Sequence, residues 1–378
     1  MGTAAPCILA LNVGSATIRY ALFEAGESLR ELARDKLDGV VLSNTISSQL
    51  LDALEQQLNF TSIKALGHRI VHGMAHTQPE HITAALLTEL RSLVALAPEH
   101  LPRQLDLIAE VQSRYPQLPQ VACFDTAFHH TLPRVAKLLA IPRQFQGNGI
   151  ERYGFHGLSY SWLLHELQRS GDPAAIRGRV VMAHLGGGAS MAAILNGQCI
   201  DTSMGFTPNA GLMMSTRCGD LDPGLVSYLI GTKRMSVDEF DHMVTRTSGL
   251  LGVSETSGDM RELLSRENHD ARAAEAIELF CYQARKYLGA YTSVLGGIDC
   301  LVFTGGIGEN APQVRHRICA NLGYLGIEID DARNQANSDI ISPDVCRVRV
   351  RVIPTNEEMM IARSVAEIVF ANPEPGAL

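Results

Sequence analysis

The chain has 378 residues and a formal net charge of −8, with 46% hydrophobic and 19% charged residues. This is the composition of a globular protein with a sizeable core, and the length suggests two or three domains. The acidic balance argues against a surface for nucleic acid or anionic membranes. No apolar run approaches the ~20 residues that a membrane helix needs, and the N-terminus lacks a secretory pattern. We therefore expect a cytoplasmic protein with no nucleic-acid or membrane partner.

In the first half of the chain, apolar runs are spaced like strands and helices. Residues 7–24 form two apolar runs around a small Gly/Ser turn and predict a β-hairpin. The periodicity predicts helices over 45–58 and 82–96, and strands over 67–71 and 120–124. The stretch 142–150 is rich in Gly, Pro and polar residues, which predicts a loop and a domain junction.

The second half begins with a similar hairpin over 180–198. A helix over 272–297, a buried strand over 300–304, an alternating strand with one wet face over 347–353 and a helix over 357–371 follow. Alternating strands and helices predict an α/β protein of two related domains. Two unrelated hairpins are the alternative to a duplication, because strand–Gly–strand is a common pattern. The eight cysteines are scattered and form no C-x-x-C pair, so we expect buried free thiols of a reducing compartment.

Two glycine turns are candidates for binding phosphate. The chain has neither a GxxxxGK[ST] loop nor a GxGxxG motif that opens a helix. Instead, Gly186-Gly187-Gly188 lies between two predicted strands, and the segment 305–310 (GGIGEN) follows a buried strand. Glycines allow close backbone approach to a polyanion, and N–H groups at a helix start favour negative charge. For the first turn, a plain hairpin is the alternative.

Polar residues also stand in otherwise tight or apolar segments. Arg69 lies between two histidines on a predicted strand, Asp125 ends another strand, and His156 is flanked by small residues. Arg217 lies in a Gly/Met-rich loop, and Glu357 opens a helix. Each alone could serve helix capping or core burial. Together they match phosphoryl transfer, which needs cationic donors for the phosphoryl oxygens and acidic oxygens for Mg²⁺.

Long motifs in a consistent order carry a resemblance to a known family. They are LNVGSATIR, GHRIVHG, VACFDTAFHHTLP, RYGFHGLS, HLGGGAS, DTSMGFTP, GLMMSTRCGDLDPG, SGLLGVS, FTGGIGEN and VIPTNEEMMIAR. The chain resembles the acetate, propionate and butyrate kinase family of the sugar kinase, heat-shock ATPase and actin superfamily. The resemblance implies an α/β fold of two related actin-like (ribonuclease H-like) domains with a nucleotide cleft between them. The implied domains are 1–148, completed by the helix 359–378, and 149–358 for nucleotide binding and dimerisation.

The resemblance also implies an activity and roles for single residues. The activity is reversible, ATP-dependent phosphorylation of a short carboxylate, acetate above all, with Mg²⁺ or Mn²⁺, in a homodimer. An ionised carboxylate is already a nucleophile, so direct in-line transfer needs no general base. The implied catalytic residues are Arg19, Arg69, Asp125, His156 and Arg217, and the implied metal ligands are Asn12 and Glu357. The acyl substrate would contact Arg69, Val71, Glu99, His100, Phe155 and Pro208. The nucleotide would contact Arg19, His184, Gly186, Gly187, Gly188, Asp259, Met260, Arg261, Gly305, Gly306, Ile307, Gly308, Glu309 and Asn310.

Four positions depart from the family's usual pattern. Arg19 stands where the family has Lys, Ala16 replaces a Ser of the first turn, and Gly187 replaces an Asn. Glu99 replaces a Leu of the small apolar pocket for the acyl group, and a carboxylate there is costly unless it is paired. We hypothesise that Glu99 shifts the preference towards a polar or larger acid; the alternative is that it turns outward and acetate remains the substrate.

Other functions stay open at the level of the sequence. The changes at Ala16 and Gly187 suggest a weakly active nucleotide-binding paralogue as one alternative. A sugar kinase would need a base such as Asp125, yet two arginines at one site suit an anionic acceptor better. An actin-like filament is an alternative on fold grounds only.

Overall fold

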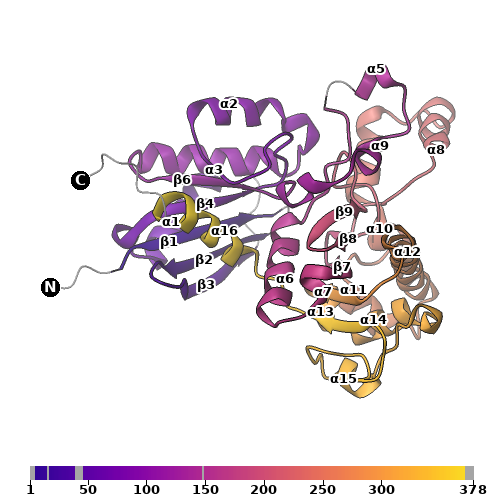
Figure 1. The fold of residues 1–378 in the computed structure, drawn as a ribbon. Helices are drawn as coiled ribbons and strands as arrows, with labels where there is room; N and C mark the ends of the chain where they lie inside the picture. The colour runs from indigo at the N-terminus through magenta and orange to yellow at the C-terminus, as the bar shows by residue number, and fades with distance from the viewer. Residues whose placement is uncertain (1–4, 15–16, 39–45, 147–148, 371–378) are drawn as a thin grey trace. The chain divides into compact units, whose positions relative to one another are not determined.

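The computed structural model describes residues 5–14, 17–38, 46–146 and 149–370. The chain forms two compact units, which are described separately here (Figure 1). The first consists of Met1–Phe128, Gly157–Trp162 and Asn356–Leu378, and the second of His129–His156 and Leu163–Thr355. The domains expected from the sequence have other bounds, and these stay a prediction.

The first unit is built on a six-stranded sheet with the order β3-β2-β1-β4-β6-β5. Its strands are β1 (Cys7–Val13), β2 (Thr17–Glu24), β3 (Arg30–Asp38), β4 (Ile63–Ile70), β5 (Glu80–His81) and β6 (Gln120–Phe124). Strands β1, β2 and β3 form an antiparallel meander, whereas β4 and β6 extend the sheet in parallel with β1. Strands β1 and β6 are buried along their whole length, which explains their continuous apolar runs.

Helices cover both faces of this sheet. Along β1, Leu9 and Leu11 pack with α1 (Ile46–Gln57) and α3 (Leu101–Arg114), while Ile8 and Ala10 pack with α16 (Glu357–Val365). Figure 1 shows α16 lying along β1, β2 and β4. The alternation places Asn12 on the same face as Ala10, towards α16. The unit also contains η1 (Phe60–Ser62), α2 (Ala84–Ser92), η2 (Val94–Leu96), the start of α6 (Gly157–Arg169) and η6 (Ala366–Phe370).

The second unit repeats the strand order of the first. Its strands are β7 (Arg179–Leu185), β8 (Ala189–Leu195), β9 (Gln198–Thr202), β10 (Cys300–Thr304) and β11 (Arg349–Val352), in the order β11-β10-β7-β8-β9. Again three antiparallel strands are followed by two parallel ones. This shared topology identifies the two hairpins as starts of related units and confirms the expected α/β fold class.

Helix α12 (Ala271–Leu295), with 25 residues, packs at the centre of several elements of the second unit. Helix α12 begins where Asp270 accepts hydrogen bonds from two backbone N–H groups, and it ends at Gly296 with φ 69°. It packs against α10 (Gly249–Ser254), α11 (Met260–Arg266), α14 (Pro312–Cys319), β7 and β8. The segment η3 (Ala127–Thr131) contains residues of both units. The other helical segments of the second unit are α4 (Arg134–Lys137), α5 (Arg143–Gln146), α7 (Ala174–Arg177), α8 (Pro223–Ser227), η4 (Tyr228–Thr232), α9 (Val237–Arg246), α13 (Gly305–Asn310), η5 (Gly323–Leu325) and α15 (Asp331–Gln335).

Two sequence predictions were wrong in detail. The loop predicted over 142–150 contains the short helix α5. The strand β11 has no fully wet face, because Arg351 is buried and its guanidinium pairs with Asp172 at 3.2 Å and with Asp339 at 2.7 Å. Ion pairing therefore allowed a charged residue to take an inward position that alternation alone assigns to solvent.

Two further expectations agree with the structure. None of the eight cysteines is disulfide-bonded, and all except Cys218 and Cys346 are buried. Burial raises the pKa of the Cys123 thiol to about 12, which keeps it protonated and unreactive. Within the described ranges, none of the helices has the length and apolar character that a bilayer crossing requires.

Candidate active site

In the first unit, the candidate residues gather at the carboxyl ends of the parallel strands. Asn12 stands near the end of β1, Arg69 near the end of β4, and Asp125 directly after β6. Glu357 is the first residue of α16, which packs on the same sheet. In open α/β sheets this edge is where ligands bind.

A buried ion pair joins two of these strands. The guanidinium of Arg69 donates from Nε to both oxygens of Asp125, at 3.0 and 3.1 Å, and from Nη2 to Oδ2 at 2.6 Å. The Asp125 side chain is fully buried. Burial alone would lower the pKa of Arg69, but the nearby carboxylates of Asp125 and Glu357 raise it above its usual value. Arg69 therefore provides a permanent, oriented positive charge at this edge.

Asn12 connects that ion pair to two acidic residues. Its Nδ2 donates to Glu357 Oε2 at 2.7 Å and to Glu358 Oε1 at 2.8 Å, and its Oδ1 accepts from Arg69 Nη1 at 3.2 Å. Glu357 and Glu358 are both buried. Sequence reasoning missed Glu358, although it adjoins Glu357 in the same motif.

The chemistry of this donor set fits Mg²⁺. Adjacent buried carboxylates supply hard oxygen ligands, which Mg²⁺ prefers. Among the described residues, no group of three or more His, Cys, Asp or Glu side chains could enclose a metal by itself. A site with few protein ligands suits Mg²⁺, because this ion keeps several waters and is shared with substrate phosphates. Here the nitrogen of Asn12 faces the carboxylates, so Asn12 holds Glu357 and Glu358 in place.

Arg19 lies beside this group. It stands directly opposite Asn12 in the β1–β2 ladder, and opposite residues in a ladder project from the same face. Its side chain is exposed. The preceding turn with Ser15 and Ala16 lies outside the described residues, so the substitution at Ala16 stays a prediction.

The first unit also contains part of the expected acyl site. Val71 is buried, and its N–H donates to Gln104 Oε1 at 3.1 Å. Gln104 in turn donates to the carbonyl of Val13 at 3.0 Å, which ties the ends of β1 and β4 to α3. Glu99 and His100 are half-buried directly before α3. Sequence reasoning did not single out Gln104, whose signal was a polar residue on the apolar face of a helix.

In the second unit, His156 is held in an uncommon backbone conformation. It precedes α6 with φ 60° and ψ 25°, in the left-handed region that non-glycine residues rarely adopt. Its Nδ1 lies 2.8 Å from Ser190 Oγ, and its ring stacks on that of His184 with centroids 4.2 Å apart. His184 and Ser190 are opposite each other in the β7–β8 ladder. Sequence reasoning missed Ser190, a polar residue inside an apolar strand.

The first glycine turn brings His156 together with Arg217. A Cβ atom at Gly188 would lie 2.8 Å from Arg217 Nη2 and 3.0 Å from His156 Nε2. Arg217 also donates from Nη1 to the carbonyl of Pro208 at 2.7 Å. Only a residue without a side chain lets both side chains approach this turn so closely. At Gly187, by contrast, a Cβ atom would lie 3.8 Å from Ser215 Oγ, an ordinary contact, so the position has room for a Cβ atom.

The second glycine turn adjoins the first. Both follow neighbouring parallel strands, β7 and β10, and a Cβ atom at Gly186 would lie 3.7 Å from Gly306 N. Helix α13 begins at Gly305, whose φ of 78° requires glycine. Glu309 Oε1 accepts from the N–H groups of Gly305 and Thr355 at 2.9 and 3.0 Å, so this carboxylate holds the turn in place. The other members of the turn, Ile307, Gly308 and Asn310, belong to the same helix α13.

The remaining predicted residues lie elsewhere in the second unit. Asp259 caps α11 and pairs with Arg261 at 2.6 Å, which lowers the pKa of the Asp259 carboxyl. Met260 is buried in the core. Phe155 is buried, and its carbonyl oxygen lies 2.9 Å from His129 Nε2.

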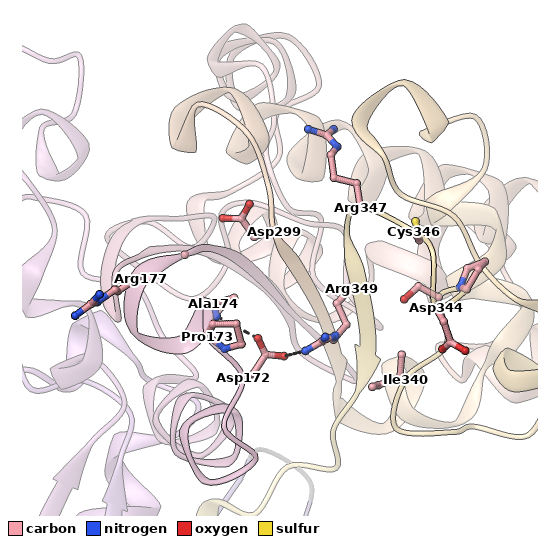
Figure 2. Close-up of a pocket in the computed structure, with 13 residues that line it drawn as sticks. Asp172, Pro173, Ala174, Arg177, Asp299, Ile340, Asp344, Cys346, Arg347 and Arg349 are labelled. Atoms are coloured by element: carbon pink, nitrogen blue, oxygen red, sulfur yellow. Dashed lines mark hydrogen bonds and ion pairs between the residues drawn. The ribbon is translucent and has the colours of Figure 1, made fainter.

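A pocket of about 640 Å³ lies at the opposite edge of the second sheet (Figure 2). Its lining includes Gly178, Asp299 and Arg349, which stand at the amino ends of β7, β10 and β11. In Figure 2, Asp172 pairs with Arg349, while the side chain of Arg177 points away from this ion pair. The glycine turns follow the carboxyl ends of β7 and β10, so this pocket is not part of the candidate site.

Comparisons with known proteins identify the family of the chain. The model of the Acetokinase family matches residues 43–363. The chain belongs to this family. It is 42% identical to the acetate kinase of Rhodopseudomonas palustris over 95% of this chain and 97% of that protein. It is 41% identical to the acetate kinase of Symbiobacterium thermophilum, over 96% and 99%.

Solved structures of family members also match nearly the whole chain. The acetate kinase of Porphyromonas gingivalis has a TM-score of 0.85 and 32% identity, over 97% of this chain and 100% of that one. A propionate kinase from Francisella tularensis has a TM-score of 0.84 and 35% identity, over 95% and 98%. The chain is therefore a kinase of the acetokinase family with an actin-like fold.

Proposed function

We propose that this acetokinase uses ATP to phosphorylate acetate reversibly and so forms acetyl phosphate. Family membership supports the reaction, and the observation that carries its chemistry is the approach of His156 and Arg217 to the turn at Gly188. Two hydrogen-bond donors, the His156 ring and the Arg217 guanidinium, lie at one backbone turn. This arrangement suits a phosphoryl group, whose negative charge is spread over several oxygens.

The first unit would bind the carboxylate and the metal. Arg69, oriented by Asp125, presents its guanidinium to the carboxylate of the substrate. Glu357, held by Asn12, would bind Mg²⁺, for which Mn²⁺ can substitute. When bound, the divalent ion neutralises the phosphate charges of ATP. Arg19, opposite Asn12, would add a positive charge for the phosphoryl group.

The second unit would bind the nucleotide and stabilise the transition state. Backbone N–H groups of the two glycine turns, 186–188 and 305–310, would hold the phosphates. His184, Asp259, Met260 and Arg261 would take part in nucleotide binding. His156 and Arg217 would donate hydrogen bonds to the oxygens of the transferring group. The attacking carboxylate is an anion, so no residue has to act as a general base.

The acyl preference is the part of this proposal that depends on the chain's own departures. The residues proposed to contact the acyl group are Val71, Glu99, His100, Phe155 and Pro208. Glu99 is half-buried, so both the inward and the outward orientation of its carboxylate stay hypotheses. We propose to compare kcat/KM for acetate, propionate, butyrate and hydroxy acids in the wild type and in Glu99→Leu. An unchanged acetate preference in both proteins would refute a role of Glu99 in specificity.

ADP release with Mg²⁺-ATP across a panel of short carboxylates tests the activity itself. We expect turnover to be fastest with acetate and to yield one acyl phosphate per ADP. ATP binding without ADP release, for every acid in the panel, would instead identify the chain as a nucleotide-binding paralogue.

We also propose a cytoplasmic homodimer. Eight free cysteines suit a reducing compartment. The segment with α8, η4 and α9 exposes large apolar side chains, among them Leu221, Tyr228 and Val237, and such a surface favours burial against a second copy. Sedimentation analysis should give twice the chain mass of 41.0 kDa. A monomer at micromolar concentration would contradict the proposal.

A further inference from the structure

Arg34 on β3 contacts three side chains near the carboxylates of the candidate site. Its Nε and Nη2 donate to Glu31 at 3.0 and 2.9 Å, and its Nη1 donates to Glu358 Oε2 at 2.8 Å. Its Nη2 also donates to Asn356 Oδ1 at 2.6 Å. No sequence motif singles out Arg34, yet one guanidinium holds both the cap and the first turn of α16.

The register of the sheet explains how Arg34 reaches α16. Arg34 is opposite Ala21 in the β2–β3 ladder, and Ala21 is opposite Ala10 in the β1–β2 ladder. Residues opposite one another project from the same face, here the face that α16 covers. The two alanines are small, so the long side chain of Arg34 can extend towards the N-terminus of the helix.

Glu358 connects Arg34 to Asn12 through hydrogen bonds. One oxygen of Glu358 accepts from Arg34, and the other accepts from Asn12 Nδ2. The same Asn12 nitrogen donates to Glu357, so two buried carboxylates lie beside one amide group. Adjacent buried carboxylates repel each other unless a cation compensates them. Arg34 provides that compensation for Glu358, and Glu357 can then remain next to it.

We propose that Arg34 is a positioning residue for the metal-binding end of the site. It fixes Glu358, and through Glu358 it fixes the Asn12 amide that holds Glu357 for the metal. This inference rests on the proposed function, because that function assigns Mg²⁺ to Glu357. Partners that orient metal ligands typically change metal affinity by 10–100-fold when they are removed.

The test is the direct binding of Mn²⁺ to the Arg34→Met variant. Free Mn²⁺ is measured by electron paramagnetic resonance in the presence of ADP, without any turnover. We expect the dissociation constant for Mn²⁺ to rise at least tenfold, measured at a temperature at which melting curves show the variant to be folded. Arg30→Met is the matched control, since Arg30 lies on the same strand and pairs with Glu24 at 2.7 Å instead. This control should bind Mn²⁺ like the wild type.

Two further variants separate positioning from a general loss of structure. In a Glu358→Met background, Arg34→Met should cause little additional weakening, because a methionine cannot accept the hydrogen bond that Arg34 donates to Glu358. Arg34→Lys keeps the charge but cannot bind three partners at once, so it should weaken Mn²⁺ binding about threefold. If Arg34→Met is unstable, Arg34→Lys replaces it in the experiment. A dissociation constant within twofold of wild type in Arg34→Met, or in Arg34→Lys when only that variant folds, would overturn the inference. Absence of Mn²⁺ binding in the wild type would instead refute the metal site of the proposed function.

Discussion

The close approach of two side chains at Gly188 leads to a sharp prediction for Gly188→Ala. The added Cβ atom would lie 2.8 Å from Arg217 Nη2 and 3.0 Å from His156 Nε2. Non-bonded atoms pack at about 3.5–4.0 Å, so both groups would have to move by roughly 0.5–1 Å. The atoms in contact are ends of side chains, so we expect the fold to survive and the positioning of the two donors to be lost.

The size of the effect follows from that displacement. Misplacing catalytic groups by about 1 Å can reduce the rate about 100-fold, which corresponds to about 2.7 kcal/mol in the activation barrier. We therefore expect kcat for acetyl phosphate formation to fall about 100-fold at saturating substrates. The hydroxamate assay for acyl phosphate measures this, and thermal melting checks the fold.

The neighbouring glycine provides the control. At Gly187 the corresponding Cβ atom would lie 3.8 Å from Ser215 Oγ, an ordinary contact. Gly187→Ala should therefore keep kcat within about threefold of wild type, because no catalytic side chain has to move. If Gly188→Ala also stayed within threefold while folding normally, the proposed meeting of His156 and Arg217 at this turn would be refuted.

Three further predictions concern single contacts. Ser190→Ala removes the partner of His156 and should lower kcat about tenfold with little change in the KM for ATP; unchanged kcat in steady-state kinetics would contradict this. Asp125→Asn removes the counter-charge that Asp125 gives to the buried Arg69. We expect the free energy of unfolding, measured with denaturant, to fall by about 3–5 kcal/mol and turnover to be undetectable. An unfolding curve like that of the wild type would contradict a stabilising role of the ion pair. Burial lowers the pKa of His129 to about 4, so the unfolded state binds the proton at a higher pH than the folded state does. The free energy of unfolding should therefore fall by up to about 3 kcal/mol as the pH drops from about 6.5 to 4. In melting curves, His129→Asn should flatten this pH dependence.

The elements that could be predicted from the sequence are those with a buried apolar run. Strands β1, β6, β7 and β10 and helices α1 and α12 all have such a signal, since they form the core of each unit. Strand β3 was not predicted, because its sequence RELARDKLD is mostly charged and exposed. It forms a strand because its backbone pairs with that of β2. Such pairing with another strand cannot be recognised from the local pattern of apolar residues.

The candidate site was predictable where residues lie in motifs, and not where they act through partners. Arg69, Asp125 and His156 stand out as polar residues in tight segments, so the sequence directs attention to them. Arg34 is one charged residue among several on an edge strand, and only the register of the sheet shows that it reaches Glu358. The structure thus adds the supporting contacts that motifs do not contain.

The placement of α16 has a consequence for the order of events on the ribosome. The sheet of the first unit is made from residues 7–124, but the helix that covers one of its faces begins only at Glu357. Until that helix leaves the exit tunnel, Ile8, Ala10 and Phe23 lack the cover of α16 on that face. The second unit, which ends at Thr355, is fully synthesised before the first can close. Nascent chains of this protein should therefore depend on chaperones that shield apolar strands until the last helix, with Glu357 and Glu358 in its first turn, docks onto the sheet.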